Sequence, residues 1–172
     1  MRDIESIIST NALAAHAAII ERVSKELSSL AAQIDNERKV FAQLDGEDAA
    51  KRRTATTDGV RAATIAVLSG MAKQPGVYGA VADEVAGVVS KFKNEWRELV
   101  QSGNVKAADE KEGAIHGVRL AARVVAKILA NGNPSFDTGK FLRRCMTWSY
   151  LDEESDYVNR SVFVEGVTWT GD

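Results

Sequence analysis

The chain has 172 residues and a formal net charge of −2, and its hydrophobic (45%) and charged (27%) fractions are those of a globular domain. No apolar run approaches the roughly 20 residues of a membrane-spanning helix, and the first ten residues lack the pattern of a signal peptide. The single cysteine, Cys145, excludes an internal disulfide and suits a reducing compartment. We expect a cytoplasmic protein without a membrane partner.

Charged and aromatic residues are unevenly distributed along the chain. Residues 150–172 hold six acids and one base, a net charge of −5, so residues 1–149 carry +3. Seven of the eleven aromatic residues lie between Phe136 and Trp169. The sequence therefore predicts two parts, a helical body at 1–149 and an acidic, aromatic-rich tail at 150–172.

The first helix is expected at about 3–45, where apolar residues recur at spacings of three and four. This heptad seam consists of Leu13, Ile20, Val23, Leu27, Leu30, Ile34, Phe41 and Leu44, with His16 and Glu37 as polar interruptions. Such a helix would be roughly 60 Å long, whereas a compact domain of this size is about 40 Å across. Either the helix breaks near residues 9–11, or another subunit packs on the seam. The seam of an oligomer and the apolar face of a monomeric bundle both fit the pattern.

A polar connection is expected at 47–59, and then shorter elements. Amphipathic helices are predicted at about 60–73, 79–101, 106–130 and 138–146, separated by segments that contain Pro75-Gly76, Gly103 and Pro134. The fold class is therefore mainly α, a helical bundle with a long N-terminal amphipathic helix.

The tail has a different pattern. Ser161 and Glu165 flank three apolar residues that are typical of strands, and residues 167–170 alternate between apolar and polar, which predicts a small C-terminal β strand or hairpin. Its apolar edge, Val162, Phe163, Val164 and Trp169, could add to the sheet of a neighbouring chain.

The segment around Gly132 and Gly139 has some features of a phosphate-binding loop. That motif needs four residues between its first glycine and a Gly-Lys pair, then Ser or Thr. Here six residues separate the glycines, and Phe141 follows Lys140. We therefore expect no nucleotide, and no other cofactor or small-molecule ligand is indicated.

Catalytic and metal-binding patterns are weak. Asp109, Glu112 and His116 share one helix face, but they are typical of a solvated first turn, and a site without a second histidine is a poor transition-metal cage. Cys145 and His116 are the one candidate nucleophilic pair, with Arg143 and Arg144 near the thiol. The sequence thus predicts no catalytic site and no metal.

Six basic residues lie between 113 and 144, with Asp137 as the one acid in that range. They are Arg119, Arg123, Lys127, Lys140, Arg143 and Arg144. Three interpretations stay open: a solvated helix face or a docking surface for the acidic tail, a contact for an acidic protein partner, and a site for nucleic-acid phosphates.

Residues 118–145 resemble a segment that ends many short proteins of phages, plasmids and actinobacteria. In those proteins a helix is followed by Asn-Pro-x-Phe-Asp, a basic residue, Phe and Cys. The matching residues here are Asn133, Pro134, Phe136, Asp137, Phe141 and Cys145. The resemblance implies a mobile-element origin and no particular activity. It also gives the segment a structural interpretation, in which Asn-Pro makes a turn, Asp137 caps a helix, and the two phenylalanines anchor it.

The leading hypothesis is a non-enzymatic, phage-derived interaction protein that acts by self-assembly or by binding another protein. A virion structural component is slightly favoured over an inhibitor of host defence, which would place the chain in the virion or in the host cytoplasm. The second hypothesis is a nucleic-acid-binding accessory protein that uses the basic face of residues 119–144. The third is an enzyme that uses His116 and Cys145.

Overall fold

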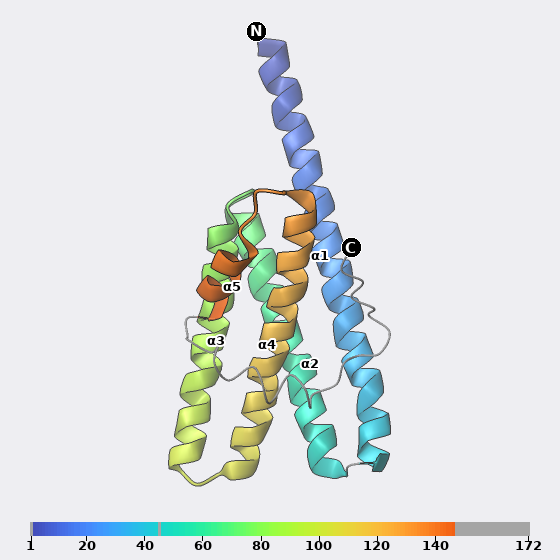
Figure 1. Ribbon diagram of the computed structural model, residues 1–172, viewed down its shortest axis with the longest axis vertical. Coiled ribbons are helices and arrows are strands. Elements are labelled where there is room, and N and C mark those ends of the chain that lie inside the picture. The colour runs from blue at the N-terminus through green and yellow to red at the C-terminus, as the bar shows by residue number, and fades with distance from the viewer. Residues whose placement is uncertain (1, 45, 147–172) are drawn as a thin grey trace.

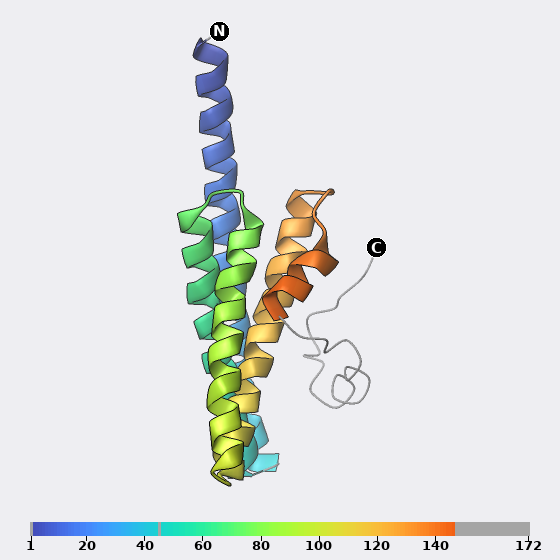
Figure 2. The same ribbon diagram turned by 90° about the vertical axis from the view of Figure 1, so that its left-hand side faces the viewer.

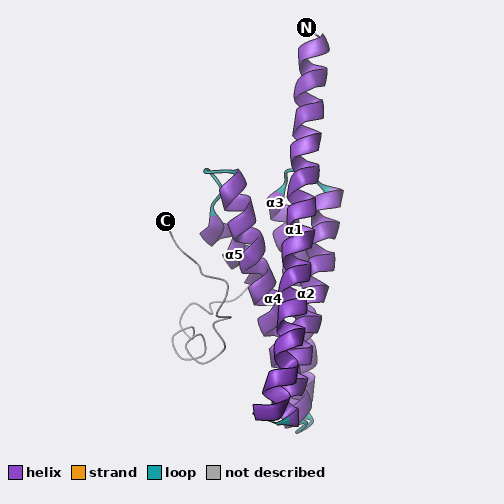
Figure 3. Cartoon of the chain, turned by 90° about the vertical axis from the view of Figure 1, so that its right-hand side faces the viewer, coloured by secondary structure: helices purple, strands orange, loops and turns teal. Residues whose placement is uncertain are grey.

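The computed structural model describes residues 2–44 and 46–146, and within them the chain forms five α-helices and no strand (Figure 1, Figure 3). The helices are α1 (Arg2–Leu44), α2 (Glu47–Lys73), α3 (Tyr78–Gln101), α4 (Val105–Gly132) and α5 (Thr138–Met146). The predicted helical bundle is confirmed for this part of the chain. The expected strand or hairpin, with Val162, Phe163, Val164 and Trp169, lies outside the described residues. None of the described helices is both long and apolar enough to cross a membrane.

The structure corrects the expectation of a polar connection at 47–59, because this stretch is the first half of α2. Its polar composition is compatible with a helix for two reasons. Glu47 and Asp48 stand in the first turn, where the helix dipole favours negative charge. Ala49 and Ala50 add high helix propensity. The connection between α1 and α2 shrinks to a tight turn at Gly46, whose φ is 88°.

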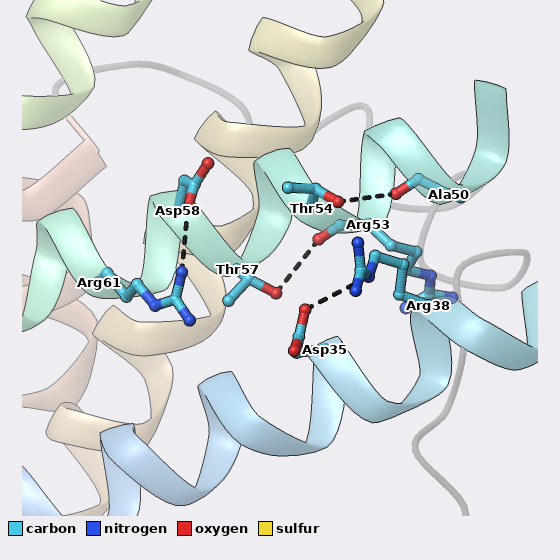
Figure 4. Close-up of polar contacts among 8 residues, drawn as sticks. All are labelled: Asp35, Arg38, Ala50, Arg53, Thr54, Thr57, Asp58 and Arg61. Carbon is cyan, nitrogen blue, oxygen red and sulfur yellow. Dashed lines mark hydrogen bonds and ion pairs between the residues drawn. The ribbon is translucent and has the colours of Figure 1, made fainter. Parts of the chain in front are cut away.

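The threonines of this stretch satisfy their hydroxyl groups within the helix. Thr54, Thr56 and Thr57 each donate to the carbonyl oxygen four residues earlier, at distances of 3.1, 2.9 and 3.3 Å. Figure 4 shows two of these bonds, with the Asp35–Arg38 ion pair on the neighbouring α1. A threonine paired in this way can be buried, and Thr56 and Thr57 are.

The four long helices form a flattened bundle. α2 and α4 are in contact with each other, and each also contacts α1 on one side and α3 on the other. α1 and α3 make no contact within the described residues. The short α5 packs on α3 and α4 near the end of the bundle where α3 begins (Figure 1, Figure 2).

Glycines line the contact between α2 and α4. A Cβ on Gly59 would overlap the carbonyl oxygen of Ala114, and a Cβ on Gly117 would overlap that of Thr56. Gly113, one turn before Gly117, makes a similar approach to α2. The two backbones are therefore in direct contact, which only residues without a side chain permit.

The core is built from small and medium aliphatic residues of all five helices. Its fully buried members include Val23, Leu27 and Ile34 of α1, Val60, Val67 and Met71 of α2, Val81, Val85 and Val89 of α3, Val118, Val125 and Leu129 of α4, and Cys145 of α5. Valine and alanine dominate because the close approach of α2 and α4 leaves little volume between the helices.

The N-terminal part of α1 projects beyond the other helices (Figure 1, Figure 3). His16 marks the level at which it leaves the bundle, since its Nε2 lies 3.1 Å from the carbonyl oxygen of Met71, close to the end of α2. Residues 2–15 are therefore an extension of about 20 Å. We call them the N-terminal extension. The helix does not break near residues 9–11.

The heptad seam divides at this level. Val23, Leu27 and Ile34 are fully buried in the core of their own chain, and Ile20 and Leu30 pack against it. Leu13, in the extension, is 61% exposed. The middle of the seam is thus occupied by the chain itself, and an aspartate at Leu27 would disrupt folding rather than report on an oligomer. The side chains of Phe41 and Leu44 lie outside the description.

We expect Gly117→Ala to lower the free energy of unfolding by about 1–3 kcal/mol, because the added methyl group forces α2 and α4 apart. Urea unfolding followed by circular dichroism at 222 nm measures this loss. Gly87→Ala is the matched control, since Gly87 is exposed in the middle of α3 with open space around its Cβ position.

Alanine at position 87 should stabilise the protein by about 0.5–1 kcal/mol through its higher helix propensity. Equal effects of the two substitutions would contradict the backbone contact between α2 and α4.

Candidate interaction surfaces

The segment between α4 and α5 is a structural corner. The side-chain oxygen Oδ1 of Asn133 accepts a hydrogen bond from the Ser135 backbone amide at 3.0 Å. Oδ1 of Asp137 accepts one from the Lys140 amide at 2.7 Å, which caps the first turn of α5. The interpretation of this segment as a turn followed by a capped helix is confirmed.

Aromatic contacts hold the corner against the bundle. The Phe136 ring meets Tyr78 of α3 edge to face, with centroids 5.7 Å apart, and lies 5.4 Å from the ring of Phe141. Phe141 is buried in the core and Phe136 is partly buried against it. Both phenylalanines therefore anchor α5, as expected.

An ion pair attaches the last turn of α5 to α3. Nε and Nη2 of Arg144 donate to the two carboxylate oxygens of Asp83, at 2.6 and 2.7 Å. This hydrogen bond lowers the pKa of Asp83 and raises that of Arg144. Arg144 thus belongs to the α3–α5 contact, although the sequence placed it in one patch with the bases of α4. Lys140 and Arg143 stand exposed on α5.

Four basic side chains of α3 and α4 influence one another electrostatically. Burial is the first cause that lowers the pKa of Lys93, to about 8, and the charges of Arg119 and Arg97 are the next. Burial and then Arg119 also lower the pKa of Arg123. Lys93 and Arg97 come from α3, and Arg119 and Arg123 from α4. We call these four residues the cationic face.

His116 of α4 is influenced by basic residues of both α4 and α2. The imidazole is mostly buried, which is the main reason that its pKa falls to about 4, and Arg119, Arg52, Arg123 and Arg53 lower it further. Arg52 forms an ion pair with Asp109 at 3.0 Å, while Arg53 pairs with a carboxylate of α1. His116 is therefore a neutral imidazole surrounded by cations at pH 7.

Two of the four residues of the cationic face, Arg119 and Arg123, were predictable from the sequence. The four-residue spacing of Arg119, Arg123 and Lys127 on α4 was visible, and Arg123 and Lys127 are exposed as expected. Lys93 and Arg97 were missed, although they share a face of α3 at the same spacing. Which face of α3 meets α4 is a tertiary property, and no local pattern encodes it.

The structure does not assemble a catalytic or metal site from the candidate residues. Cys145 is fully buried, and burial raises the pKa of its thiol to about 12, the opposite of an activated nucleophile. Asp109 is engaged with Arg52. Within the described residues, no group of three histidine, cysteine or acidic side chains could hold a metal ion.

The N-terminal extension is a second candidate surface, because most of it belongs to a long segment of α1 without charged residues. Residues 6–20 contain no Asp, Glu, Lys or Arg, and they include five alanines and one histidine. Six of the seven residues from 12 to 18 are small or apolar, and all six are exposed: Ala12, Leu13, Ala14, Ala15, Ala17 and Ala18. A solvated helix normally carries charge on its outer face, so this segment has the composition of a contact.

Comparisons with known proteins give no identification. No protein-family model matches the chain, and no curated protein or solved structure matches it either. Function therefore has to be argued from the two surfaces alone.

We expect His116 to make stability depend on pH. Its pKa is about 4 in the folded protein and about 6.5 when unfolded. Between these values the unfolded chain binds more protons, so stability present above pH 6.5 is lost as the pH falls towards 4. The loss reaches at most on the order of 3 kcal/mol. Urea unfolding at several pH values measures it.

His116→Gln removes this titration, so the difference in unfolding free energy between wild type and variant should shrink as the pH falls. Other titrating groups cancel in that difference. A difference independent of pH would contradict a neutral, buried imidazole at position 116. Arg119→Gln should reduce the slope in part, since it removes the cation that lowers the pKa of His116 most while leaving the imidazole buried.

Proposed function

We propose that the protein is a non-enzymatic, phage-derived interaction protein that assembles with copies of itself through the N-terminal extension. The observation that carries this proposal is the uncharged segment 6–20 on a helix that leaves its own bundle. The resemblance of residues 118–145 to segments of phage proteins supports the origin.

The chemistry of the extension favours a second copy as its partner. The side chains of the extension that the structure describes, at residues 12–15, are three alanines and one leucine, and they carry no charge with which to select an acidic or basic partner. Small residues let two helices approach closely along their length. Residues 2–15 carry a net charge of only −1, so two extensions would repel each other little.

Geometry favours an assembly of more than two chains. One face of the extension is a strip about 20 Å long and about 10 Å wide, on the order of 200 Å². A stable interface buries about 800 Å² on each partner. Each extension would thus have to contact several neighbours, or further surfaces would have to join in. This requirement slightly favours a virion structural component over an inhibitor of host defence, since repeated contacts suit a regular assembly.

Leu13→Glu should dissociate the assembly to a chain of 18.6 kDa, because it places a charge in the apolar contact. Light scattering on a sizing column measures the mass of wild type and variant. Ile65→Glu is the matched control, since Ile65 is 72% exposed on α2, away from the extension. It should leave the assembly intact.

A wild-type chain that is monomeric at micromolar concentration would contradict self-assembly and favour a small inhibitor with a different protein partner. Dissociation by Ile65→Glu but not by Leu13→Glu would place the contact on the bundle instead.

The alternative is a nucleic-acid-binding accessory protein, and the cationic face is the observation that favours it. Four basic residues from two helices converge there, a footprint suited to phosphate backbones. We expect any such binding to weaken steeply with salt and to be lost in Arg119→Glu/Arg123→Glu. Fluorescence anisotropy with a DNA duplex measures both effects. An affinity for DNA that does not change with salt concentration, or that is unchanged in the double variant, would exclude this function.

A further inference from the structure

Exposed apolar side chains gather at the two ends of the bundle. Among the side chains that the structure describes, six large apolar ones are exposed: Leu13, Val40, Ile65, Val77, Val100 and Val105. Ile65 lies along the side of the bundle, about two turns before the end of α2. Single exposed apolar residues are normal on a protein surface. A distribution that places the other five near the ends indicates contacts made end to end.

Leu13 and Val77 lie at the end from which the N-terminal extension projects. His16 is level with the carbonyl group of Met71, so Leu13, three residues earlier, is about 4.5 Å beyond that level. Val77 precedes the first turn of α3, at the same end of the bundle, and is 50% exposed (Figure 1). We call this end, together with the extension, the extension end.

Val40, Val100 and Val105 lie at the opposite end. Val40 is one turn before the end of α1, and Val100 and Val105, 47% and 75% exposed, flank the turn between α3 and α4. Figures 1 and 2 both show the α1–α2 and α3–α4 turns at the end far from the N-terminus. There Nζ of Lys106 lies 3.2 Å from Oδ2 of Asp48, which joins the first turns of α2 and α4. We call this end the hairpin end.

Charged side chains at the hairpin end are paired within the chain. In the first two turns of α2 and α4, three acids and three bases form ion pairs at N–O distances of 3.0, 3.2 and 3.0 Å: Glu47–Lys51, Asp48–Lys106 and Asp109–Arg52. An apolar partner can therefore pack beside them without leaving any of these six charges without its counter-charge. Residues 6–20 of α1, which include no charged residue, have the composition of such a partner.

We propose that copies of the chain assemble head to tail, with the extension end of one copy packed on the hairpin end of the next. This inference rests on the proposed function, self-assembly through the N-terminal extension, and names the second surface that it requires. Because the two surfaces differ, the contact is heterologous and can repeat to form a ring or a filament. A pairing of two extensions would instead close after two chains and leave the three valines of the hairpin end exposed.

The area of the head-to-tail contact reaches that of a specific interface. A copy stacked on the extension end must lie beside the extension, which then overlaps about 20 Å of its length and contributes on the order of 200 Å². Four helix ends, each about 10 Å across, add on the order of 300 Å². The contact thus buries about 1,000 Å² over both partners, the lower limit for a specific interface. The extension alone does not reach this area.

Val100→Lys/Val105→Glu tests the hairpin end without a change in net charge. A lysine in the last turn of α3 and a glutamate in the first turn of α4 both suit the helix dipole, and neither turn carries such a charge in the wild type. The fold should therefore be retained, which circular dichroism at 222 nm checks. We expect the mass measured by light scattering to fall from that of the wild-type assembly to 18.6 kDa. Ile65→Glu, the control on the side of the bundle, should leave the mass unchanged.

Mixing two variants distinguishes head-to-tail packing from pairing of extensions. Leu13→Glu keeps an intact hairpin end, and Val100→Lys/Val105→Glu keeps an intact extension end, so one productive contact remains between them. We expect each variant alone to have the mass of one chain. An equimolar mixture should contain particles of two chains and none larger, as measured by light scattering on a sizing column.

The same masses separate a failure of this inference from a failure of the proposed function. A Val100→Lys/Val105→Glu variant that assembles like the wild type would overturn head-to-tail packing and leave self-assembly in place. Two dissociated variants whose mixture stays at the mass of one chain would also overturn it. A wild-type chain that is itself monomeric would overturn both the proposed function and this inference.

Discussion

The backbone contact between α2 and α4 determines the shape of the whole bundle. Gly59, Gly113 and Gly117 bring these two helices together without side chains between them. The distance between α2 and α4 is therefore fixed by their backbones. α1 and α3 are thereby kept on opposite sides and do not meet in the described part of the chain. Each of them packs against both helices of the α2–α4 pair, and α5 packs on α3 and α4. The fold therefore depends on three positions that have no side chain at all.

The sequence predicted the helices where periodicity is strong and failed where packing decides. The apolar rows of α3 and α4, such as Val81 with Val85 and Val118 with Val125, are buried as expected. The corner after α4 was predictable because Asp137 acts locally. The stretch 47–59 was not, since its polar composition suggested a loop. Only the contact with α4 shows why its threonines and Gly59 suit a helix: they are small enough to be buried against another backbone.

The two candidate surfaces show the same limit. A heptad seam does not reveal whether its partner belongs to the same chain, and the structure assigns Val23, Leu27 and Ile34 to the chain's own core. The part that remains without cover from the other described helices is the extension, where the heptad pattern is weakest. Likewise, the row of basic residues on α4 was predictable from the sequence. Lys93 comes near it only because α3 packs against α4. Surfaces built from two helices need the tertiary structure.

The electrostatics of the cationic face follow from the packing of α3 on α4. Burial first, and then the charges of Arg119 and Arg97, lower the pKa of Lys93 to about 8. The N-terminal extension, by contrast, has a net charge of only −1 and leaves the bundle as a separate projection (Figure 1). A contact through the extension would be mainly apolar, and a contact through the cationic face would be ionic. The two surfaces therefore respond to different conditions, since added salt weakens ionic contacts and leaves apolar contacts in place.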